Sequence, residues 1–368
     1  MRWYWSVMNY RYLHIILPLS LLVLSINLSY FIALILSEFT MMEVWVWAAF
    51  CGLLTPLATY ALIKLERKVG FLAPDVHKPN KPLIPRTSGP AFLISTSLLL
   101  LTGYFFNNPY IVMHSLASIT AGLLGLYDDL RGLNAFMKVA LFTVPGLIIA
   151  LGGVFDPHPY IPVVGGVRIT ILYPLLLIVA YTVITNAYNM IDTHNGITPF
   201  VALITAIALL ISTNMNGPSP LPGGLSITAF VIIALLTYLP FNLYPAKIFN
   251  GNTMSFMIGS LIASQAILLR REFLLIMLSA PLILNGFGII SSIKGFKNKE
   301  AIPRPVTLTS EFKLKPSKNV NAPITLVQLL TLSKPLSEKE LIIAYYALIV
   351  INAVTSLALY QVLSSLHI

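Results

Sequence analysis

The chain has 368 residues, of which 57% are hydrophobic and only 10% are charged, with a mean hydropathy of +0.83 and a net charge of +10. Soluble domains carry about a quarter charged residues, so this composition excludes an ordinary soluble protein. Many apolar blocks approach the roughly 20 residues that cross a bilayer core. We therefore predict an all-α integral membrane protein. The single cysteine, Cys51, excludes an intramolecular disulfide.

In chain order, the apolar blocks predict a polytopic bundle of about eleven transmembrane helices, at residues 13–36, 44–63, 90–106, 110–127, 139–151, 171–185, 197–213, 225–241, 254–269, 273–290 and 341–364. The first block resembles a signal peptide, but its length, the lack of an Ala-x-Ala site and the spans that follow favour a retained extra helix. We expect one transmembrane catalytic domain over residues 1–368. Its long loop at 291–340 contains an alternating stretch, 305–314, that predicts a small β-hairpin-like element.

The basic residues orient the bundle. Twenty of the twenty-three Lys and Arg residues fall on the side of the N-terminus, and only Arg168, Arg270 and Arg271 fall on the other side. By the positive-inside rule, the loops at 64–89, 128–138, 186–196, 242–253 and 291–340 are cytoplasmic. A basic face of this kind suits anionic membrane lipids and would also attract a phosphorylated substrate. No soluble basic domain is present, so we expect no nucleic-acid partner.

Four of the five aspartates, Asp75, Asp128, Asp129 and Asp192, lie near the ends of apolar spans on the predicted cytoplasmic side. Carboxylates at membrane depth usually face a cavity or a partner, which makes them candidate site residues. The alternative is that they are interfacial residues in water.

The first two polar loops contain candidate phosphate and metal ligands. Residues 75–89 carry Asp75 and Lys78, and their prolines and terminal glycine exclude a regular helix. In the second loop, Asp128 and Asp129 are adjacent and Lys138 follows nine residues later. Adjacent carboxylates repel each other, and a bound divalent cation relieves this; Mg²⁺ takes oxygen ligands and tends to bring phosphate with it.

The next two loops are rich in amides. If residues 186–192 are helical, Asn186, Asn189 and Asp192 share one face. Helix capping and hydrogen bonding between helices are the alternative reading. The fourth loop, 242–253, combines Lys247, Phe249 and Gly251 with a predicted helix start at Thr253. Such a start offers free N–H groups, so the loop is typical of a cradle for phosphate and base.

Taken together and in this order, the motifs Asp128-Asp129, 186–196 and 242–253 resemble those of the polyprenyl-phosphate N-acetylhexosamine-1-phosphate transferases. That family includes the bacterial phospho-MurNAc-pentapeptide translocase. The step from Asp129 to Lys138 and the tail segments 303–304, 307–314 and 326–330 match most closely the archaeal and eukaryotic UDP-GlcNAc:dolichyl-phosphate GlcNAc-1-phosphate transferases. The resemblance covers roughly residues 44–365.

The resemblance implies transfer of GlcNAc-1-phosphate from UDP-GlcNAc to dolichyl or another polyprenyl phosphate, with Mg²⁺ (or Mn²⁺) as cofactor. It places the catalytic role on Asp128, Asp129 and Lys138, and metal binding on Asn189, Asp192 and Asn252. Asn195 and Phe249 would meet the uracil and Arg304 the pyrophosphate. The remaining substrate-binding expectations are Asp75, Lys78, Asn186, Lys247 and Gly251.

Two departures from the family pattern stand out. Asn252 replaces an aspartate that ligates the metal in the family, and an amide brings no negative charge. We hypothesise that Asp192 supplies the missing charge. The family's basic cluster in the last loop is reduced here to Arg304 between two prolines, so its alignment is ambiguous.

Three alternatives remain open from the sequence: another UDP-N-acetylhexosamine donor, a family member impaired in catalysis, and a secondary transporter. A transporter would show symmetric halves and acids in mid-span, whereas these acids lie at loop junctions on one side. The spare loops and single cysteine suit a prokaryotic, archaeal cell membrane better than the ER. The bacterial branch suggests a homodimer.

Overall fold

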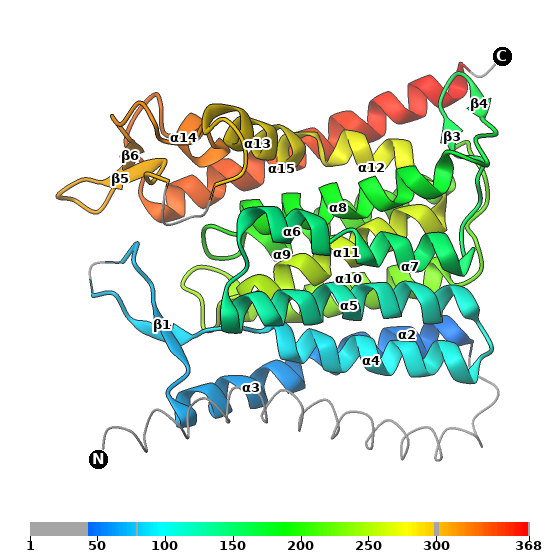
Figure 1. Cartoon of the computed structure of the whole chain (residues 1–368), viewed down its shortest axis with the longest axis horizontal. Helices are drawn as coiled ribbons and strands as arrows, with labels where there is room; N and C mark the ends of the chain where they lie inside the picture. Colours follow the sequence, from blue (N-terminus) through cyan, green and yellow to red (C-terminus); the bar gives the residue numbers. More distant parts are fainter. Residues whose placement is uncertain (1–42, 79, 298–301, 367–368) are drawn as a thin grey trace.

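The computed structural model describes residues 43–366, apart from residues 79 and 298–301, so the predicted helix at 13–36 lies outside the described part. The helices lie side by side in one bundle, with connecting loops at its two ends (Figure 1). Their bounds are α2 Val44–Leu53, α3 Thr55–Val69, α4 Gly89–Phe105, α5 Pro109–Arg131, α6 Ala135–Leu141, α7 Val144–Gly152, α8 Tyr173–Ile191, α9 Ile197–Ile211, the 3-10 turn η1 Ser212–Asn214, α10 Gly224–Asn242, α11 Gly251–Leu269, α12 Glu272–Leu278, α13 Ala280–Ser292, α14 Leu326–Leu330 and α15 Glu338–Ser365.

These helices confirm the predicted all-α membrane fold. Within the described residues, eight helical segments are long and apolar enough to cross a membrane, with α2–α3, α6–α7 and α9–η1 each forming one of them. The pair α12–α13, bent by 62°, is a ninth if its two helices form one span, and α4 is a shorter apolar helix. Together they account for every predicted span from residue 44 onward. The predicted loop at 64 starts later, because α3 continues to Val69.

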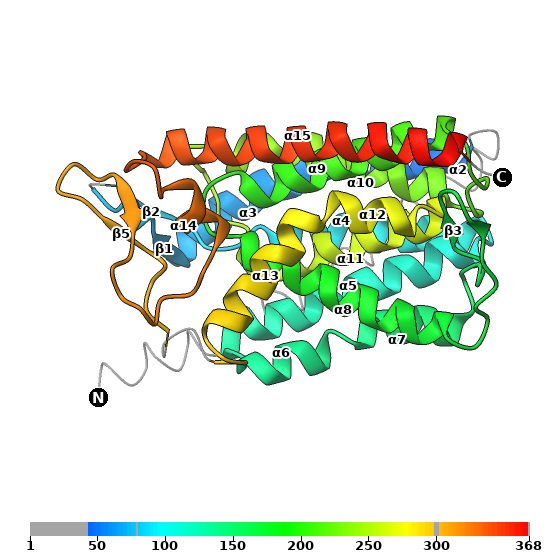
Figure 2. The same cartoon turned by 90° about the horizontal axis from the view of Figure 1, so that it is seen from above.

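Three short β-hairpins lie at the two ends of the bundle. Strand β1 (Leu72–Pro74) pairs with β2 (Leu83–Pro85), and β5 (Val306–Leu308) pairs with β6 (Leu314–Pro316). The second pair confirms the β-hairpin-like element predicted in the last long loop. Both hairpins lie at the left end of the bundle in Figures 1 and 2, opposite β3 (Tyr160–Ile161) and β4 (Gly165–Gly166). The loops predicted to be functional therefore meet at one end.

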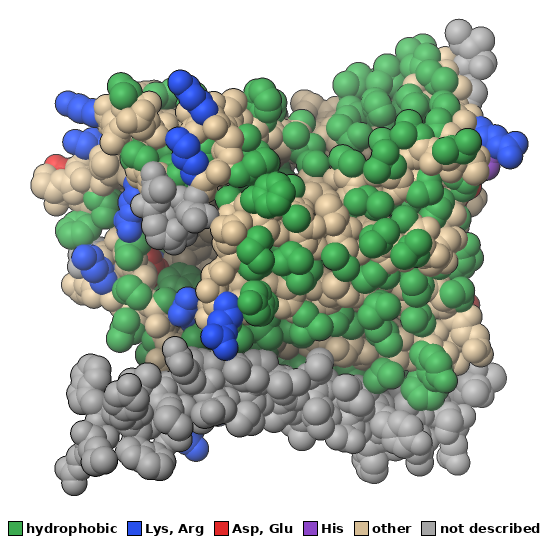
Figure 3. Space-filling view, viewed as in Figure 1, with side chains coloured by type: hydrophobic (Ala, Val, Ile, Leu, Met, Phe, Trp, Pro, Cys, Tyr) green, Lys and Arg blue, Asp and Glu red, His purple; other side chains and the backbone are tan. Residues whose placement is uncertain are grey.

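Helix α11 is the centre of the bundle. Every residue from Thr253 to Leu269 is buried, and α11 packs against α4, α5, α8, α9 and α10. The face of the molecule shown in Figure 3 is apolar along the bundle, and Lys and Arg side chains gather at the end that carries β1 and β5. This distribution is what a lipid-embedded bundle with one basic end requires.

Candidate active site

The start of α11 is held by a carboxylate from α5. The Asp129 side chain accepts hydrogen bonds from the backbone N–H groups of Asn252 and Thr253, each at 2.9 Å, and from the Thr253 hydroxyl at 2.7 Å. The first turn of a helix has N–H groups without partners, so a carboxylate here satisfies two of them and meets the positive end of the dipole. Asp129 therefore works as a cap supplied by another helix.

A glycine makes this approach possible. Gly125 lies one turn before Asp129 on α5, and a Cβ added there would lie 2.6 Å from the Asn252 carbonyl oxygen and 2.8 Å from the Thr253 Cα. Any larger residue would push α5 away from the start of α11. The close contact brings Asp128 and Asp129 together with Asn252, which lies far away in the sequence.

Asp128 belongs to a chain of polar side chains from four helices, α5, α6, α8 and α11. Its Oδ2 accepts from the Lys138 ammonium and from the Asn252 amide, both at 2.7 Å. The Asn252 Oδ1 in turn accepts from the Asn189 amide at 2.9 Å, and the same amide donates to the Ser255 hydroxyl at 2.8 Å. Three predicted catalytic or metal-binding residues are thus joined to Lys138 through direct hydrogen bonds.

The donor set of this chain fits a hard cation. Asp128, Asn189 and Asn252 carry side-chain oxygens, which are the ligands that Mg²⁺ prefers. Only one of the three is a carboxylate, and the Lys138 ammonium already offsets its charge. Both oxygens of Asp129 bond to α11. Both oxygens of Asp128 also have partners, since its Oδ1 accepts from the Leu133 N–H at 2.7 Å and its Oδ2 from Lys138 and Asn252. The residues fit Mg²⁺ in kind, with little negative charge to hold it.

A cavity of about 190 Å³ is lined by Gly251, the residue that directly precedes Asn252 of this chain. Residues 74–77, 192–195 and 249–251 form its walls, together with Asn242. Asp192, the cap residue after α8, accepts from the Asn250 amide at 2.6 Å and from the Thr198 hydroxyl at 2.9 Å. Asn242 holds two of the walls together, because it accepts from Gly196 N and donates to the Ile248 carbonyl. Phe249 and Gly251, predicted to bind the nucleotide, both line the cavity.

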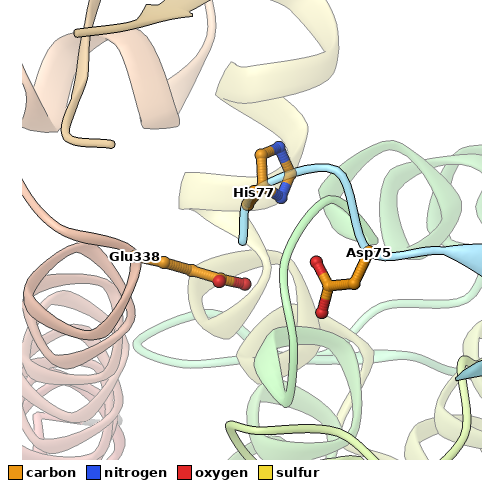
Figure 4. Close-up of side chains that lie close together, drawn as sticks. All are labelled: Asp75, His77 and Glu338. Carbon is orange, nitrogen blue, oxygen red and sulfur yellow. The ribbon is translucent and has the colours of Figure 1, made fainter. Parts of the chain in front are cut away.

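The first loop meets the last helix at the mouth of the cavity. The Lys78 ammonium contacts Asp75 and lies 3.5 Å from Glu338, the first residue of α15. Asp75 also accepts from the Asn195 amide at 3.1 Å. Figure 4 shows Asp75, His77 and Glu338 facing one another, and their ligand atoms lie within 4.8 Å of each other. This group could hold a cation, but Lys78 already forms ion pairs with both of its carboxylates.

Two imidazoles stack in the same region. The rings of His77 and His194 are 4.4 Å apart and nearly parallel, with 12° between their planes. Burial lowers the pKa of His77, and the nearby charges of Lys78 and Arg304 lower it further while Asp75 opposes them. Burial also lowers the pKa of His194 well below its ordinary value, and His77 and Lys78 act in the same direction. Arg304, itself exposed, thus lies near this mouth.

Two predicted site residues have partners outside this network. The Asn186 amide donates to the Thr182 carbonyl of its own helix at 2.9 Å. Lys247 is exposed, with its ammonium 5.8 Å from the centre of the Phe241 ring. The expectation of free N–H groups at the start of α11 is wrong, because Asp129 occupies those of Asn252 and Thr253; α11 also begins earlier than predicted, at Gly251.

Sequence reasoning missed several residues at the site. Glu338 sits in the first turn of α15, where an acid reads as an ordinary helix cap. Ser255 is a small polar residue in an apolar span. Glu66 is flanked by basic residues and resembles a solvated position, although it is 2% exposed. Asn250 was missed as well. Its position within the fourth loop, 242–253, was the one signal in the sequence that could have identified it.

The bundle carries a cluster of carboxylates, amides and lysines at one end. The class that the fold and this cluster define is a membrane protein with a polar reaction site. Residues 111–270 match the family model described as glycosyl transferase family 4. This match confirms the resemblance seen in the motifs of the chain.

Individual relatives agree with this assignment. A protein of Saccharolobus solfataricus is 31% identical over 220 residues, covering 56% of this chain and 66% of that protein. One of Sulfolobus acidocaldarius is 31% identical over 218 residues, covering 57% and 66%. Both carry the provisional name UDP-N-acetylglucosamine–dolichyl-phosphate N-acetylglucosaminephosphotransferase. A phospho-N-acetylmuramoyl-pentapeptide-transferase of Dictyoglomus thermophilum is 32% identical over 206 residues, covering 53% and 64%. The matches thus span just under two thirds of these relatives.

Proposed function

We propose that this protein transfers GlcNAc-1-phosphate from UDP-GlcNAc to dolichyl or another polyprenyl phosphate, giving polyprenyl-diphosphate-GlcNAc and UMP. The observation that carries the proposal is the hydrogen-bonded chain Lys138–Asp128–Asn252–Asn189 beside the cavity lined by Phe249. This arrangement supports the proposal, because charged groups that could meet two phosphates lie near a cavity with an aromatic residue that could meet a base. The names of the archaeal relatives support the donor and the acceptor.

In this reaction an oxygen of the lipid phosphate attacks the β-phosphorus of the donor. The bond from that phosphorus to the oxygen bridging the two donor phosphates breaks, and UMP leaves with the electron pair. Phosphoryl transfer of this kind depends on positioning and on neutralising charge. Asp128 would orient or deprotonate the lipid phosphate, and Lys138 would offset the charge of the phosphates. Mg²⁺, held by Asn189, Asn252 and Asp128, would neutralise the diphosphate when bound.

Asp129 takes a supporting role in this proposal. Because its carboxylate is committed to α11, it fixes the backbone of Asn252 and so orients the amide that touches both Asp128 and Asn189. Phe249 would stack on the uracil, and Asn195, held by Asp75, would meet the base edge. Lys78 and Arg304 would face the entering phosphates at the mouth.

We further propose that Asp192 contributes the negative charge that Asn252 lacks. Asp192 lines the cavity and is oriented by Asn250, the residue between Phe249 and Gly251. Its charge would then act on the cation at short range. Replacing Asp192 with Asn should raise the Mg²⁺ concentration needed for half-maximal transfer. An unchanged Mg²⁺ requirement in Asp192→Asn would remove this role.

The cellular setting is also a proposal. The basic end of the bundle carries the site, and by the positive-inside rule it faces the cytoplasm. The archaeal relatives support a prokaryotic cell membrane. A homodimer, expected from the bacterial branch, stays a prediction. Size measurement of the purified protein in detergent, corrected for bound detergent, would test it.

The decisive experiment measures UMP release from UDP-GlcNAc by the purified full-length protein with dolichyl phosphate and Mg²⁺. Release that requires the acceptor and is lost in Asp128→Asn supports the transferase. Parallel reactions with UDP-GalNAc and UDP-MurNAc-pentapeptide test the donor. Release by Asn252→Asp but not by the wild type would identify an impaired family member. If neither the wild type nor Asn252→Asp releases UMP with any of the donors and several polyprenyl phosphates, the proposal is overturned and a binding or transport role is favoured.

A further inference from the structure

Helix α3 contains a buried carboxylate that the proposed reaction does not use. Glu66 is 2% exposed, and its Oε2 accepts the backbone N–H groups of Arg86 at 2.6 Å and Thr87 at 3.3 Å. The ion pairs formed by the described residues do not include Glu66. Burying a carboxylate is unfavourable unless hydrogen bonds compensate, so these two N–H groups are what keep it in place.

The N–H groups held by Glu66 belong to the short segment 85–88, which joins β2 to α4. This segment is hydrogen-bonded to the loop before α11, through both the N–H and the carbonyl of Phe249. Phe249 N donates to the Pro85 carbonyl at 2.9 Å, and Ser88 N donates to the Phe249 carbonyl at 2.9 Å. The Thr87 hydroxyl donates to the Asn250 carbonyl at 3.0 Å. Both backbone polar groups of Phe249 are therefore fixed by segment 85–88.

Segment 85–88 also fits tightly against the turn that follows Phe249. Gly251 has a φ of +70°, and a Cβ there would lie 2.4 Å from the Thr87 hydroxyl oxygen. A second series of hydrogen bonds begins at the Ser88 hydroxyl, which donates to the Tyr238 hydroxyl. Tyr238 donates to the Asn250 side chain, and the Asn250 amide donates to Asp192. The path from Glu66 to the cavity wall thus consists of direct hydrogen bonds and one close packing contact.

We infer that Glu66 is a positioning residue for nucleotide binding, which fixes segment 85–88 and through it the Phe249 ring that lines the cavity. This inference rests on the proposed function, because it assigns Phe249 to the base of the donor. Stacking on an aromatic ring depends on the ring's orientation, so loss of the Glu66 bonds weakens binding of the uridine nucleotide. The lipid phosphate is assigned to Asp128 and Lys138, whose side chains are not part of this path. The bond from segment 85–88 to their side of the site is that of the Arg86 guanidinium to the Asp129 carbonyl, at 3.5 Å.

The test measures UDP binding by calorimetry to the full-length protein in detergent. Glu66→Ala should weaken UDP binding about tenfold, because the two hydrogen bonds from segment 85–88 to the Glu66 carboxyl group are lost. Glu66→Gln keeps an oxygen at the same reach and should restore most of the affinity. Arg67→Ala, which changes the exposed neighbour on α3, should leave it unchanged. In transfer assays, Glu66→Ala should raise KM for the nucleotide sugar and leave KM for the lipid phosphate unchanged.

A second set of variants separates positioning from general destabilisation. In a Phe249→Ala background the Glu66→Ala change should have no further effect on UDP binding, since the ring it acts through is gone. An equal loss in both backgrounds, or wild-type affinity in Glu66→Ala, overturns the inference. Should Glu66→Ala not fold, Thr87→Val removes the hydroxyl bond to Asn250 and must show the same dependence on Phe249. A wild-type protein that does not bind UDP at all overturns the proposed function itself.

Discussion

The Oδ2 atom of Asp129 accepts both the backbone N–H and the hydroxyl of Thr253, at 2.9 and 2.7 Å. This contact joins the end of α5 to the beginning of α11, two elements that are more than 100 residues apart in the chain. It turns one of two adjacent aspartates into a helix cap and leaves the other, Asp128, for the polar chain with Lys138 and Asn252. The two carboxylates of the Asp-Asp motif therefore have different roles.

This division predicts different outcomes for the two aspartates. Asp129→Asn removes a charged acceptor from the start of α11 and should lower the free energy of unfolding by about 1–2 kcal/mol. Asp128→Asn should abolish transfer with a smaller loss of stability. Thermal unfolding in detergent and UMP release, measured on both variants, check the prediction. A larger loss of stability in Asp128→Asn than in Asp129→Asn would contradict it.

The contact of α5 with α11 should be sensitive to a single methyl group. Gly125→Ala places a Cβ 2.6 Å from the Asn252 carbonyl oxygen, where backbone and not a flexible side chain must move. We expect a loss of about 1–3 kcal/mol in stability, as for overpacked cores, and a strong loss of transfer. Gly166→Ala is the matched control, because a Cβ there meets nothing within 4 Å. Equal melting temperatures of Gly125→Ala and Gly166→Ala would contradict the expected loss of stability at Gly125.

The charge of the Asp128 chain makes a prediction about the cation. Because Lys138 offsets Asp128 and Asn252 is neutral, the wild type should bind Mn²⁺ weakly without nucleotide. Asn252→Asp should tighten Mn²⁺ binding about tenfold, or ~1.4 kcal/mol, and Lys138→Gln should also tighten it while lowering transfer. Electron paramagnetic resonance of free Mn²⁺ measures this directly. Asn186→Asp, on the same helix as Asn189, serves as a control for added charge nearby.

The stacked histidines make stability depend on pH. The pKa of His77 and that of His194 are lowered from 6.5 in the folded protein by burial, whereas the unfolded chain titrates at the ordinary value. As the pH falls below about 6.5, the unfolded state therefore binds protons that the folded state does not, and stability decreases. Above about pH 7 this loss is absent. Melting temperatures between about pH 8 and pH 5 should fall less steeply in the double variant His77→Phe, His194→Phe.

Much of the fold follows from the sequence alone. Apolar blocks of sufficient length must be helical in a bilayer, because only helices satisfy their own backbone polar groups there. This is why every predicted span from residue 44 coincides with a helix or a pair of helices, eight or nine of them long enough to cross a membrane, and why the basic loops meet at one end. The chemical character of the site was also readable, since acids and amides at span ends are rare in so apolar a chain.

The tertiary structure decided which of these residues touch. Asp128 and Asp129 are neighbours in sequence, yet only packing of α5 against α11 at Gly125 sends one to Lys138 and the other to Thr253. Glu338 and Glu66 reach the site from helices whose sequences show ordinary spans with charged ends. Helical periodicity fixes the face of a side chain on its own helix, but its partner depends on how closely and in what register two helices pack. The sequence therefore determined the membrane bundle and the residue types of its reactive end, and the packing of α3, α5, α11 and α15 decided their roles.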